Sequence, residues 1–298
     1  MCIRDSIGGP KAPFVLEGDE YDSAFFEKTP KFLRYKPFAT IITSIEHDHV
    51  DIYPDEASYI AAFDSLVARI PEDGLLVAWA GCARVRAVAS RARCRVRYYA
   101  LDRDDTGGIV PDWLAAPAPY VAGAMPFDLF GGGSSMGRVY APMSGHHNVR
   151  NALAAIALAT EGASLDLDAM LRALRTFGGV RRRQEWLGTV HGVHVYEDFA
   201  HHPTAVRETL AGLCERHPDG RILAAFEPRS ATASRAMHQE EYVHAFDAAD
   251  LAGLAPVGRP EIAKDERLDV DAIARAVVAR GREAFAAPSI TALADRLV

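Results

Sequence analysis

The 298 residues have few cysteines, no long apolar run and no excess of positive charge, and each absence excludes a class of protein. The four cysteines show no C-x-x-C spacing, which argues against a disulfide framework and against a zinc site. No apolar run reaches the roughly 18 residues that span a bilayer, and residues 1–6 lack the apolar core of a signal peptide. With a formal net charge of -7, the chain offers no basic surface to nucleic acid or to an anionic membrane. We therefore expect a cytoplasmic protein with small-molecule ligands, no nucleic-acid partner and no membrane partner.

A Walker-type phosphate loop, G-x-x-x-x-G-K-[ST], is missing as well. Gly8-Gly9-Pro10-Lys11 does not fit the pattern. Gly131 to Gly137 lacks the lysine and the strand-to-helix setting, so we expect it to be a hairpin tip. The sequence thus lacks the lysine and the backbone cradle that commonly hold nucleotide phosphates.

The chain does contain the alternation of strands and helices that is typical of α/β proteins. Apolar runs at Phe14–Leu16, Ala39–Ile45 and Leu75–Trp79 predict buried strands. Helical spacing of apolar residues from Glu56 to Ile70 lies between two of them, so we expect a parallel sheet covered by helices. Residues 95–142 are rich in glycine, proline and short alternating stretches, which predicts a small layer of hairpins.

A second unit is predicted after a boundary near residues 180–184. Before it, the patterns predict helices at His147–Thr160 and Leu167–Phe177, and Gly178-Gly179 ends the second one. After it, the expected elements are a hairpin around His191-Gly192, a helix at 204–216, a strand at 222–226 and helices at 270–279 and 289–298.

Polar residues follow the first two predicted strands. Glu17 ends one and His49 follows the other, and a carboxylate with a neutral imidazole is a reasonable partial ligand set for a divalent ion. The alternative is a solvated loop made of Glu17 and the acidic residues beside it. A third interpretation takes His47 to Asp51 as the H-x-H-x-D loop of a dinuclear metallohydrolase, but Ile52 stands where that pattern needs another histidine.

Two asparagines stand three residues apart at the start of a predicted helix. This spacing places Asn148 and Asn151 on one helix face, just after His147. Amide groups both donate and accept hydrogen bonds, which suits the edge of a purine base. Capping of the helix by one asparagine is the simpler explanation, but it leaves the second asparagine without a role.

The segment Glu197 to Thr204 combines an acid, an aromatic ring and paired histidines at a predicted strand-to-helix junction. Such junctions commonly present ligand-binding groups, although Asp198 could simply cap the next helix. Two segments with arginine are further candidates, Arg181-Arg182-Arg183 for a phosphate and Glu227-Pro228-Arg229-Ser230 for a substrate carboxylate.

Taken in order, five segments resemble the motifs of the Mur ligase family, and the resemblance runs through nearly the whole chain from about Ile7. They are Leu16–Asp22, Ile45–Asp51, His147–Leu153, Gly179–Arg183 and Asp198–Pro203. Five motifs in the right order are far more specific than any one of them. Gln184 departs from the family pattern, which commonly has an apolar or aromatic residue at this position.

The resemblance implies an enzyme that uses ATP and Mg²⁺ to convert a muramyl carboxylate into an acyl phosphate, which an amino group then attacks. It implies a UDP-sugar-binding domain, a central ATPase-like domain and a Rossmann-like C-terminal domain. A metal and an arginine together would neutralise the transferring phosphoryl group. Carried over residue by residue, the resemblance implies that Glu17 and His49 bind Mg²⁺ and that His147, Asn148 and Asn151 bind adenine. It implies that Arg183 binds phosphate, that Asp198 lies by the ribose, and that Arg229 and Ser230 recognise the acceptor. Arg183 and His49 are the implied catalytic residues.

Within the family, two segments most resemble the branch that joins the tripeptide L-Ala-γ-D-Glu-meso-diaminopimelate to UDP-N-acetylmuramate in peptidoglycan recycling. They are Glu20–Phe26 and Glu227–Ser230. The branch that adds L-alanine is the alternative. A non-catalytic nucleotide-binding remnant is an alternative of another class.

We expect the chain to be an incomplete ligase, because its sequence has no counterpart of the UDP-binding domain, the phosphate loop or the final glycine-rich strand region. The expected division is an unmatched segment at 1–6, part of the central domain at 7–182, and the C-terminal domain without its end at 183–298. Weak or no turnover is expected from the chain alone.

Overall fold

The computed structural model describes residues 13–24, 27–259 and 261–297, which divide into two compact units. The first unit contains the residues up to Pro142 together with His147–Gly178, and the second contains Met143–His146 together with the residues from Gly179 onward. The predicted unmatched segment 1–6, Gly8–Lys11 and Phe25-Phe26 lie outside the described residues. Among the described helices, none is long and apolar enough to cross a membrane.

A six-stranded sheet in the order β3-β4-β5-β6-β7-β8 forms the first unit. Its strands are β3 (Ala39–Ile42), β4 (Leu75–Trp79), β5 (Arg95–Leu101), β6 (Trp113–Pro117), β7 (Met125–Gly131) and β8 (Ser134–Ala141). The first four are parallel, while β7 and β8 run antiparallel and continue the same sheet. The predicted hairpin tip is confirmed, because Gly132 and Gly133 join β7 to β8 with positive φ angles of 55° and 78°.

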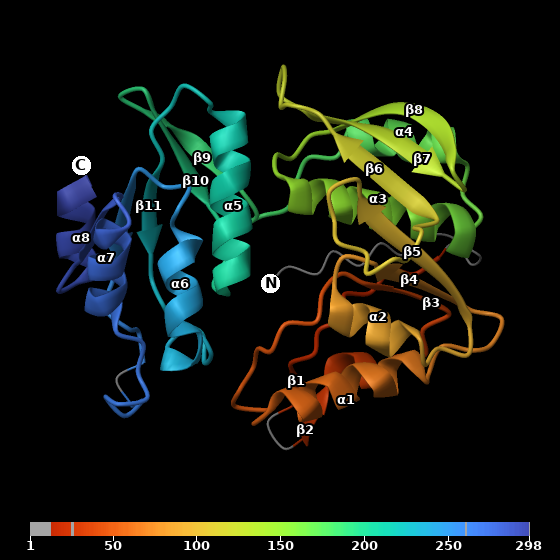
Figure 1. The fold of residues 1–298 in the computed structure, drawn as a ribbon, viewed down its shortest axis with the longest axis horizontal. Helices are drawn as coiled ribbons and strands as arrows, with labels where there is room; N and C mark the ends of the chain where they lie inside the picture. Colours follow the sequence, from red (N-terminus) through yellow and green to blue (C-terminus); the bar gives the residue numbers. More distant parts are fainter. Residues whose placement is uncertain (1–12, 25–26, 260, 298) are drawn as a thin grey trace. The chain divides into compact units, whose positions relative to one another are not determined.

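Helices cover both faces of this sheet, as Figure 1 shows. They are α1 (Glu56–Val67) and α2 (Ala83–Ala89) on one face, and α3 (His146–Gly162) and α4 (Leu167–Arg175) on the other. Successive residues of β4 alternate between the two cores: Leu76 packs in the α1 and α2 core and Val77 packs in the α3 and α4 core. Since both faces are buried, the strand is apolar throughout. The predicted α/β fold is confirmed.

The prediction of a buried strand at Phe14–Leu16 is wrong. These residues have no regular structure, and their side chains are 53%, 67% and 40% exposed. An apolar run becomes a strand only where a neighbouring strand takes its backbone hydrogen bonds. In the ranges that the structure describes, β3 is the edge of the sheet and no strand pairs with residues 14–16.

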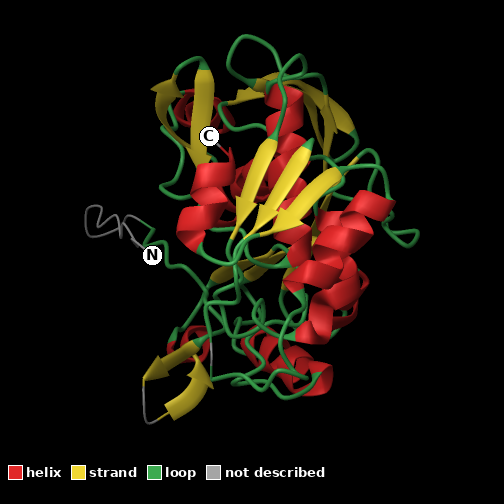
Figure 2. Cartoon of the chain, turned by 90° about the vertical axis from the view of Figure 1, so that its left-hand side faces the viewer, coloured by secondary structure: helices red, strands yellow, loops and turns green. Residues whose placement is uncertain are grey.

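A second, parallel sheet in the order β11-β12-β13 forms the centre of the second unit. Figure 2 shows its three strands side by side, with helices beside them. The elements are β11 (Leu223–Phe226), β12 (Leu251–Leu254) and β13 (Glu283–Ala286), with α5 (Pro203–Arg216), α6 (Gln239–Ala245), α7 (Val270–Ala279) and α8 (Ile290–Leu297). Helices α5, α6 and α7 share one core, and α8 packs in a smaller core around Phe285.

Short hairpins complete the two units. The predicted hairpin around His191-Gly192 is confirmed as β9 (Glu185–Val190) paired with β10 (Val193–Glu197). Both turn residues have positive φ angles, 49° and 83°, which is the geometry of the two-residue turn that suits a twisted hairpin. In the first unit, β1 (Asp22–Ala24) pairs with β2 (Glu27–Pro30).

Replacing Glu161 with glutamine should reduce the stability of the first unit at neutral pH by about 1–2 kcal/mol. The Glu161 carboxylate accepts hydrogen bonds from Arg97 Nε at 2.6 Å and Trp113 Nε1 at 2.7 Å. Burial opposes ionisation, but these two bonds and the positive charges of Arg97 and Arg95 together outweigh it, so the pKa of Glu161 is lowered. A lowered folded-state pKa gives stability that is present above the ordinary carboxyl range and is lost as pH falls through the folded value.

Urea unfolding between pH 7 and pH 3 measures this effect. The Glu161→Gln protein should lose less stability on acidification than the unsubstituted protein. The exposed Glu72→Gln variant is the matched control and should behave like the unsubstituted protein. Equal acid sensitivity of Glu161→Gln and Glu72→Gln would contradict the prediction.

Candidate functional site

Three side chains that can bind a cation lie together in the first unit, two from the segment before β1 and one from the loop after β3. One ligand-type atom from each of Asp19, Glu20 and His49 lies within 4.8 Å of the other two. His49 Nε2 is 3.3 Å from Glu20 Oε1, and Asp19 Oδ2 also accepts from Lys31 Nζ at 3.0 Å. We refer to Asp19, Glu20 and His49 as the carboxylate–histidine cluster.

Two tyrosines hold Glu20 in this cluster. Tyr59 of α1 donates its hydroxyl hydrogen to Glu20 Oε1 at 3.0 Å, and Tyr53 donates to the Glu20 carbonyl at 2.7 Å. The two rings meet edge to face, 5.0 Å between centroids. Helix α1 begins where Asp55 accepts the Ser58 amide, which places Tyr59 in the first turn. The cluster is therefore built on a capped helix and a buried aromatic pair.

The carboxylates control the charge of the imidazole. Burial acts to lower the pKa of His49, but the hydrogen bond with Glu20 and the negative charges of Asp48, Glu20 and Asp19 outweigh it, so the pKa of His49 is raised. Burial first, and then the charge of Glu20, raise the pKa of Tyr59, so its hydroxyl keeps the proton that it donates. A cation would have to compete with a proton for His49.

The donor set of this cluster fits Mg²⁺ or Mn²⁺, which prefer carboxylate oxygens and accept an imidazole. Glu17 is exposed and is not part of the cluster, so its role as a metal ligand stays a prediction. Asp19 and Glu20 were not predicted as ligands. The signal was the acidic run Glu17–Asp22, and only the fold reveals which of its carboxylates approach His49.

The dinuclear metallohydrolase interpretation finds no support in the described residues. His47 Nε2 lies 2.9 Å from the Tyr53 carbonyl oxygen, and Asp51 accepts the Tyr21 hydroxyl at 2.8 Å. In those ranges neither residue joins a group of three metal-ligand side chains. The spacing H-x-H-x-D therefore occurs here without a two-metal arrangement.

The predicted asparagine pair lies in the first turns of α3, on its less buried side. Asn151 is exposed and Asn148 and His147 are half-buried, while Val149 is fully buried in the core. Asn148 and Asn151 are one turn apart, so both amides can reach one ligand. This geometry is compatible with the predicted adenine site.

In the second unit, Asp198 organises the loop that carries Arg183. Its carboxylate accepts the Gln184 amide and the Ala200 amide, each at 2.7 Å. Arg182 and Gln184 have positive φ angles of 57° and 47°, and this strained backbone flanks Arg183, whose side chain is exposed. Gln184 is the residue that departs from the family pattern. Its side chain is buried and accepts a hydrogen bond from the Ser144 hydroxyl at 2.9 Å.

The remaining predicted residues lie after β10 and β11. Arg229 is exposed in the loop after β11, and the Ser230 hydroxyl accepts the Ala233 amide at 3.0 Å, which orders that loop. His202 is the N-cap of α5, where its Nδ1 accepts the Thr204 amide. The His201 carbonyl accepts the hydroxyl of the buried Tyr242. Sequence reasoning left the two histidines without a role, and the structure gives each a structural contact.

Replacing Asp198 with alanine should reduce the stability of the second unit by about 1–3 kcal/mol, because it leaves two backbone amides without their acceptor. Thermal unfolding followed by circular dichroism measures the effect. Asp219→Ala, at an exposed loop position of the same unit, is the control. The prediction fails if the two variants melt at the same temperature.

The fold and these sites define an α/β protein that presents polar side chains at the ends of parallel strands and at a helix start, as nucleotide-dependent enzymes do. Residues 5–159 match the Mur ligase middle domain, and residues 182–298 match the Mur ligase glutamate ligase domain. The chain belongs to the Mur ligase family. Members of this family are ATP-dependent amide-bond ligases.

Individual relatives fall in two branches of the family. The UDP-N-acetylmuramate–L-alanine ligase of Roseiflexus castenholzii is 35% identical over 268 residues, covering 86% of this chain and 54% of the relative. The UDP-N-acetylmuramate–L-alanyl-gamma-D-glutamyl-meso-2,6-diaminoheptandioate ligase of Haemophilus influenzae is 34% identical over 243 residues, covering 81% and 51%. The chain thus spans about half the length of the relatives it matches.

Solved structures of Mur ligases have a similar fold. The murein peptide ligase of Psychrobacter arcticus has a TM-score of 0.60 at 28% identity, covering 94% of this chain and 55% of that one. The UDP-N-acetylmuramate–alanine ligase of Thermotoga maritima has a TM-score of 0.64 at 21% identity, covering 86% and 52%. The expectation that the chain belongs to the tripeptide branch is not supported over its alternative, because several of the matching curated relatives are L-alanine ligases.

Proposed function

We propose that the chain provides the middle and C-terminal domains of a ligase that uses ATP to join the carboxylate of UDP-N-acetylmuramate to an amino group. The observation that carries the proposal is the match to both domains of one ligase family, together with the carboxylate–histidine cluster in the first of them. Peptidoglycan synthesis in the cytoplasm is the process to which such an activity belongs.

In this proposal His49, with the neighbouring carboxylates or Glu17, holds Mg²⁺, which supplies charge neutralisation at the phosphoryl group when it is bound. His147, Asn148 and Asn151 bind the adenine edge. Such amides can donate to the ring nitrogens of adenine and accept from its amino group.

The family resemblance also suggests roles for residues of the second unit. Arg183 would bind phosphate, because its side chain is exposed and a guanidinium suits phosphate oxygens. Asp198 would accept a ribose hydroxyl through lone pairs that its two backbone amide bonds leave available. Arg229 and Ser230 would recognise the acceptor.

L-alanine is the proposed acceptor, since several of the matching curated relatives carry the name of L-alanine ligases. A tripeptide acceptor is the second candidate. It is favoured by the 34% identity to the Haemophilus influenzae ligase and by the 28% identity to the Psychrobacter arcticus murein peptide ligase. Arg229 is the residue whose replacement separates the two, since a tripeptide offers more carboxylates to an arginine than L-alanine does.

A fusion protein tests the function. The part of the Roseiflexus castenholzii ligase that precedes its matched region is joined to this chain, and phosphate release from ATP is measured with UDP-N-acetylmuramate and either L-alanine or the tripeptide. We expect release that requires both UDP-N-acetylmuramate and one acceptor, and no release from the same fusion carrying His49→Ala. The 298-residue chain alone should release little phosphate, because it has no phosphate-loop sequence.

A folded fusion that binds ATP but shows no acceptor-dependent release would contradict the proposal. Hydrolysis of phosphoesters by the chain with Mn²⁺ and without ATP would support the metallohydrolase alternative instead. Adenine-nucleotide binding without turnover in every combination would support a nucleotide-binding remnant.

A further inference from the structure

Asp104, in the loop after β5, is a buried carboxylate that no sequence motif singles out. Its side chain is only 4% exposed. Oδ1 accepts from Arg150 Nη2 at 2.9 Å, and Oδ2 accepts from Trp79 Nε1 at 2.7 Å and from the Leu101 amide at 2.9 Å. Arg150 Nε lies 3.3 Å from Oδ2, so the guanidinium contacts both carboxylate oxygens. A carboxylate this buried is stable only with such a set of donors.

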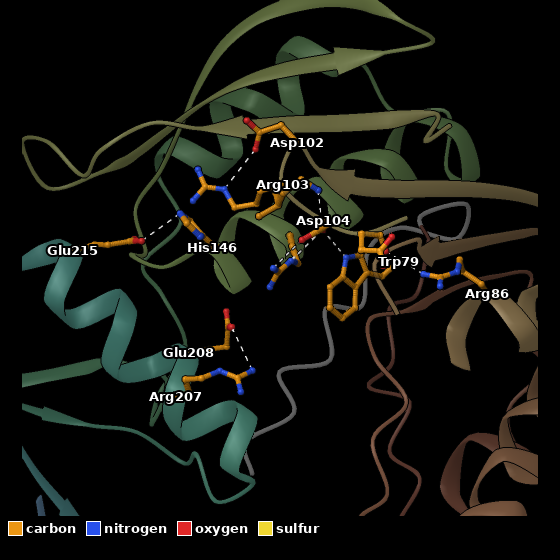
Figure 3. A network of polar contacts seen from close by, with 12 residues as sticks. Trp79, Arg86, Asp102, Arg103, Asp104, His146, Arg207, Glu208 and Glu215 are labelled. Carbon is orange, nitrogen blue, oxygen red and sulfur yellow. Dashed lines mark hydrogen bonds and ion pairs between the residues drawn. The ribbon is translucent and has the colours of Figure 1, made fainter. Parts of the chain in front are cut away.

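These contacts join three elements at the carboxyl ends of two neighbouring strands. Trp79 is the last residue of β4, Leu101 is the last residue of β5, and Arg150 lies near the start of α3. Figure 3 shows the Trp79 indole directed at Asp104. Arg86 of α2 braces the same two loops, since its Nη1 donates to the Ala80 carbonyl at 2.6 Å and to the Asp105 carbonyl at 3.2 Å. Ligands of parallel α/β sheets bind at this end of the strands.

The same contacts determine which side of α3 packs against the sheet and which side faces away from it. At about 100° per residue, the Asn148 and Asn151 side chains leave α3 on one side, and Val149 and Arg150 leave it on the other. Val149 is fully buried and the Arg150 side chain is 18% exposed, with its guanidinium 4.7 Å from the centre of the Trp79 ring. The two inward residues anchor the first turns of the helix, and the two asparagines are left on the opposite side.

Arg150 stands between two predicted adenine ligands in the sequence. Its guanidinium is already engaged by both oxygens of one buried carboxylate and by one indole ring. We propose that Asp104 is a positioning residue for the nucleotide site, which acts through Arg150 and Trp79 to hold Asn148 and Asn151 in the geometry that binds adenine. This inference rests on the proposed function.

Two measurements on the 298-residue chain test it, the affinity for MgADP and the amide hydrogen exchange of residues 147–153. Asp104→Asn and Arg150→Lys should each weaken MgADP binding on the order of tenfold, as loss of an orienting partner typically does, and each should speed exchange in 147–153. The double variant should bind MgADP with about the affinity of whichever single variant binds it less tightly, because the two residues act as one unit. Asp128→Asn is the control, since it removes a carboxylate that pairs with Arg138 at 2.7 Å elsewhere in the same unit.

Unchanged exchange in residues 147–153 of both single variants would overturn the inference, whether or not nucleotide binds. So would unchanged MgADP affinity in variants that melt at lower temperature, because a merely structural pair lowers stability without changing affinity. If the unsubstituted chain binds no adenine nucleotide, the proposed function fails, and the exchange measurement still decides the role of Asp104. Arg150→Lys retains the positive charge, so the same measurements can be made on this variant if Asp104→Asn does not fold.

Discussion

Replacing Asn151 with leucine should weaken the binding of MgADP to the chain by about 10- to 100-fold. The amide of Asn151 is exposed on α3 and lies one turn from Asn148, where the two side chains can bracket one purine edge. Leucine would leave polar atoms of the bound base without partners, which costs about 1–3 kcal/mol. Isothermal titration calorimetry measures the affinity, and Asn148→Leu should give an effect of the same size.

Ala155→Leu is the control for this substitution, because it places a leucine at another exposed position of the same helix. It should leave the affinity for MgADP within twofold of the unsubstituted chain. Equal affinity in Asn151→Leu, Asn148→Leu and Ala155→Leu would rule out the asparagine pair as the adenine site.

Replacing His49 with alanine should weaken Mn²⁺ binding by about 10- to 100-fold, since it removes the imidazole from the carboxylate–histidine cluster. Electron paramagnetic resonance of free Mn²⁺ measures the affinity. Because the pKa of His49 is raised, a proton competes with the cation, so Mn²⁺ affinity of the unsubstituted chain should rise as pH increases through that pKa. The alanine variant should lack this rise.

His244→Ala, at a position exposed on α6 of the second unit, is the control and should bind Mn²⁺ as the unsubstituted chain does. Separate Glu17→Gln and Glu20→Gln variants decide which carboxylate completes the ligand set, the one that the family resemblance implies or the one that the structure places 3.3 Å from His49. Full Mn²⁺ affinity in His49→Ala would contradict the metal site.

The elements that the sequence predicted correctly are those whose burial pattern is local. Leu75–Trp79 is apolar because both faces of β4 are covered, and α7 has the amphipathic spacing of a helix packed on one side. Elements that the sequence analysis missed are short or made of small residues, such as α2, β12 and β13. For Phe14–Leu16 the local pattern was misleading, because strand formation depends on a partner elsewhere in the chain.

The candidate sites, like the strands and helices, could be predicted only where their pattern is local in the sequence. Asn148 and Asn151 are visible in the sequence because their spacing is one helical turn. Asp104 is not visible, since its main partner Arg150 is 46 residues away and nothing in the sequence around Asp104 distinguishes it from the exposed acids. Likewise, the choice of Asp19 and Glu20 among four neighbouring acids depends on the loop that carries His49.

Asn148 and Asn151 are the only asparagines in the chain. One measurement can therefore test the central claim, that the start of α3 binds adenine. Labelling with ¹⁵N-asparagine gives NMR signals from two side-chain amides, and both belong to the proposed adenine site. Titration with MgADP should shift both pairs of side-chain signals, and titration with MgGDP should shift them much less. If MgADP binds to the chain by calorimetry and neither side-chain amide moves, then the start of α3 is not the adenine site and the account is contradicted.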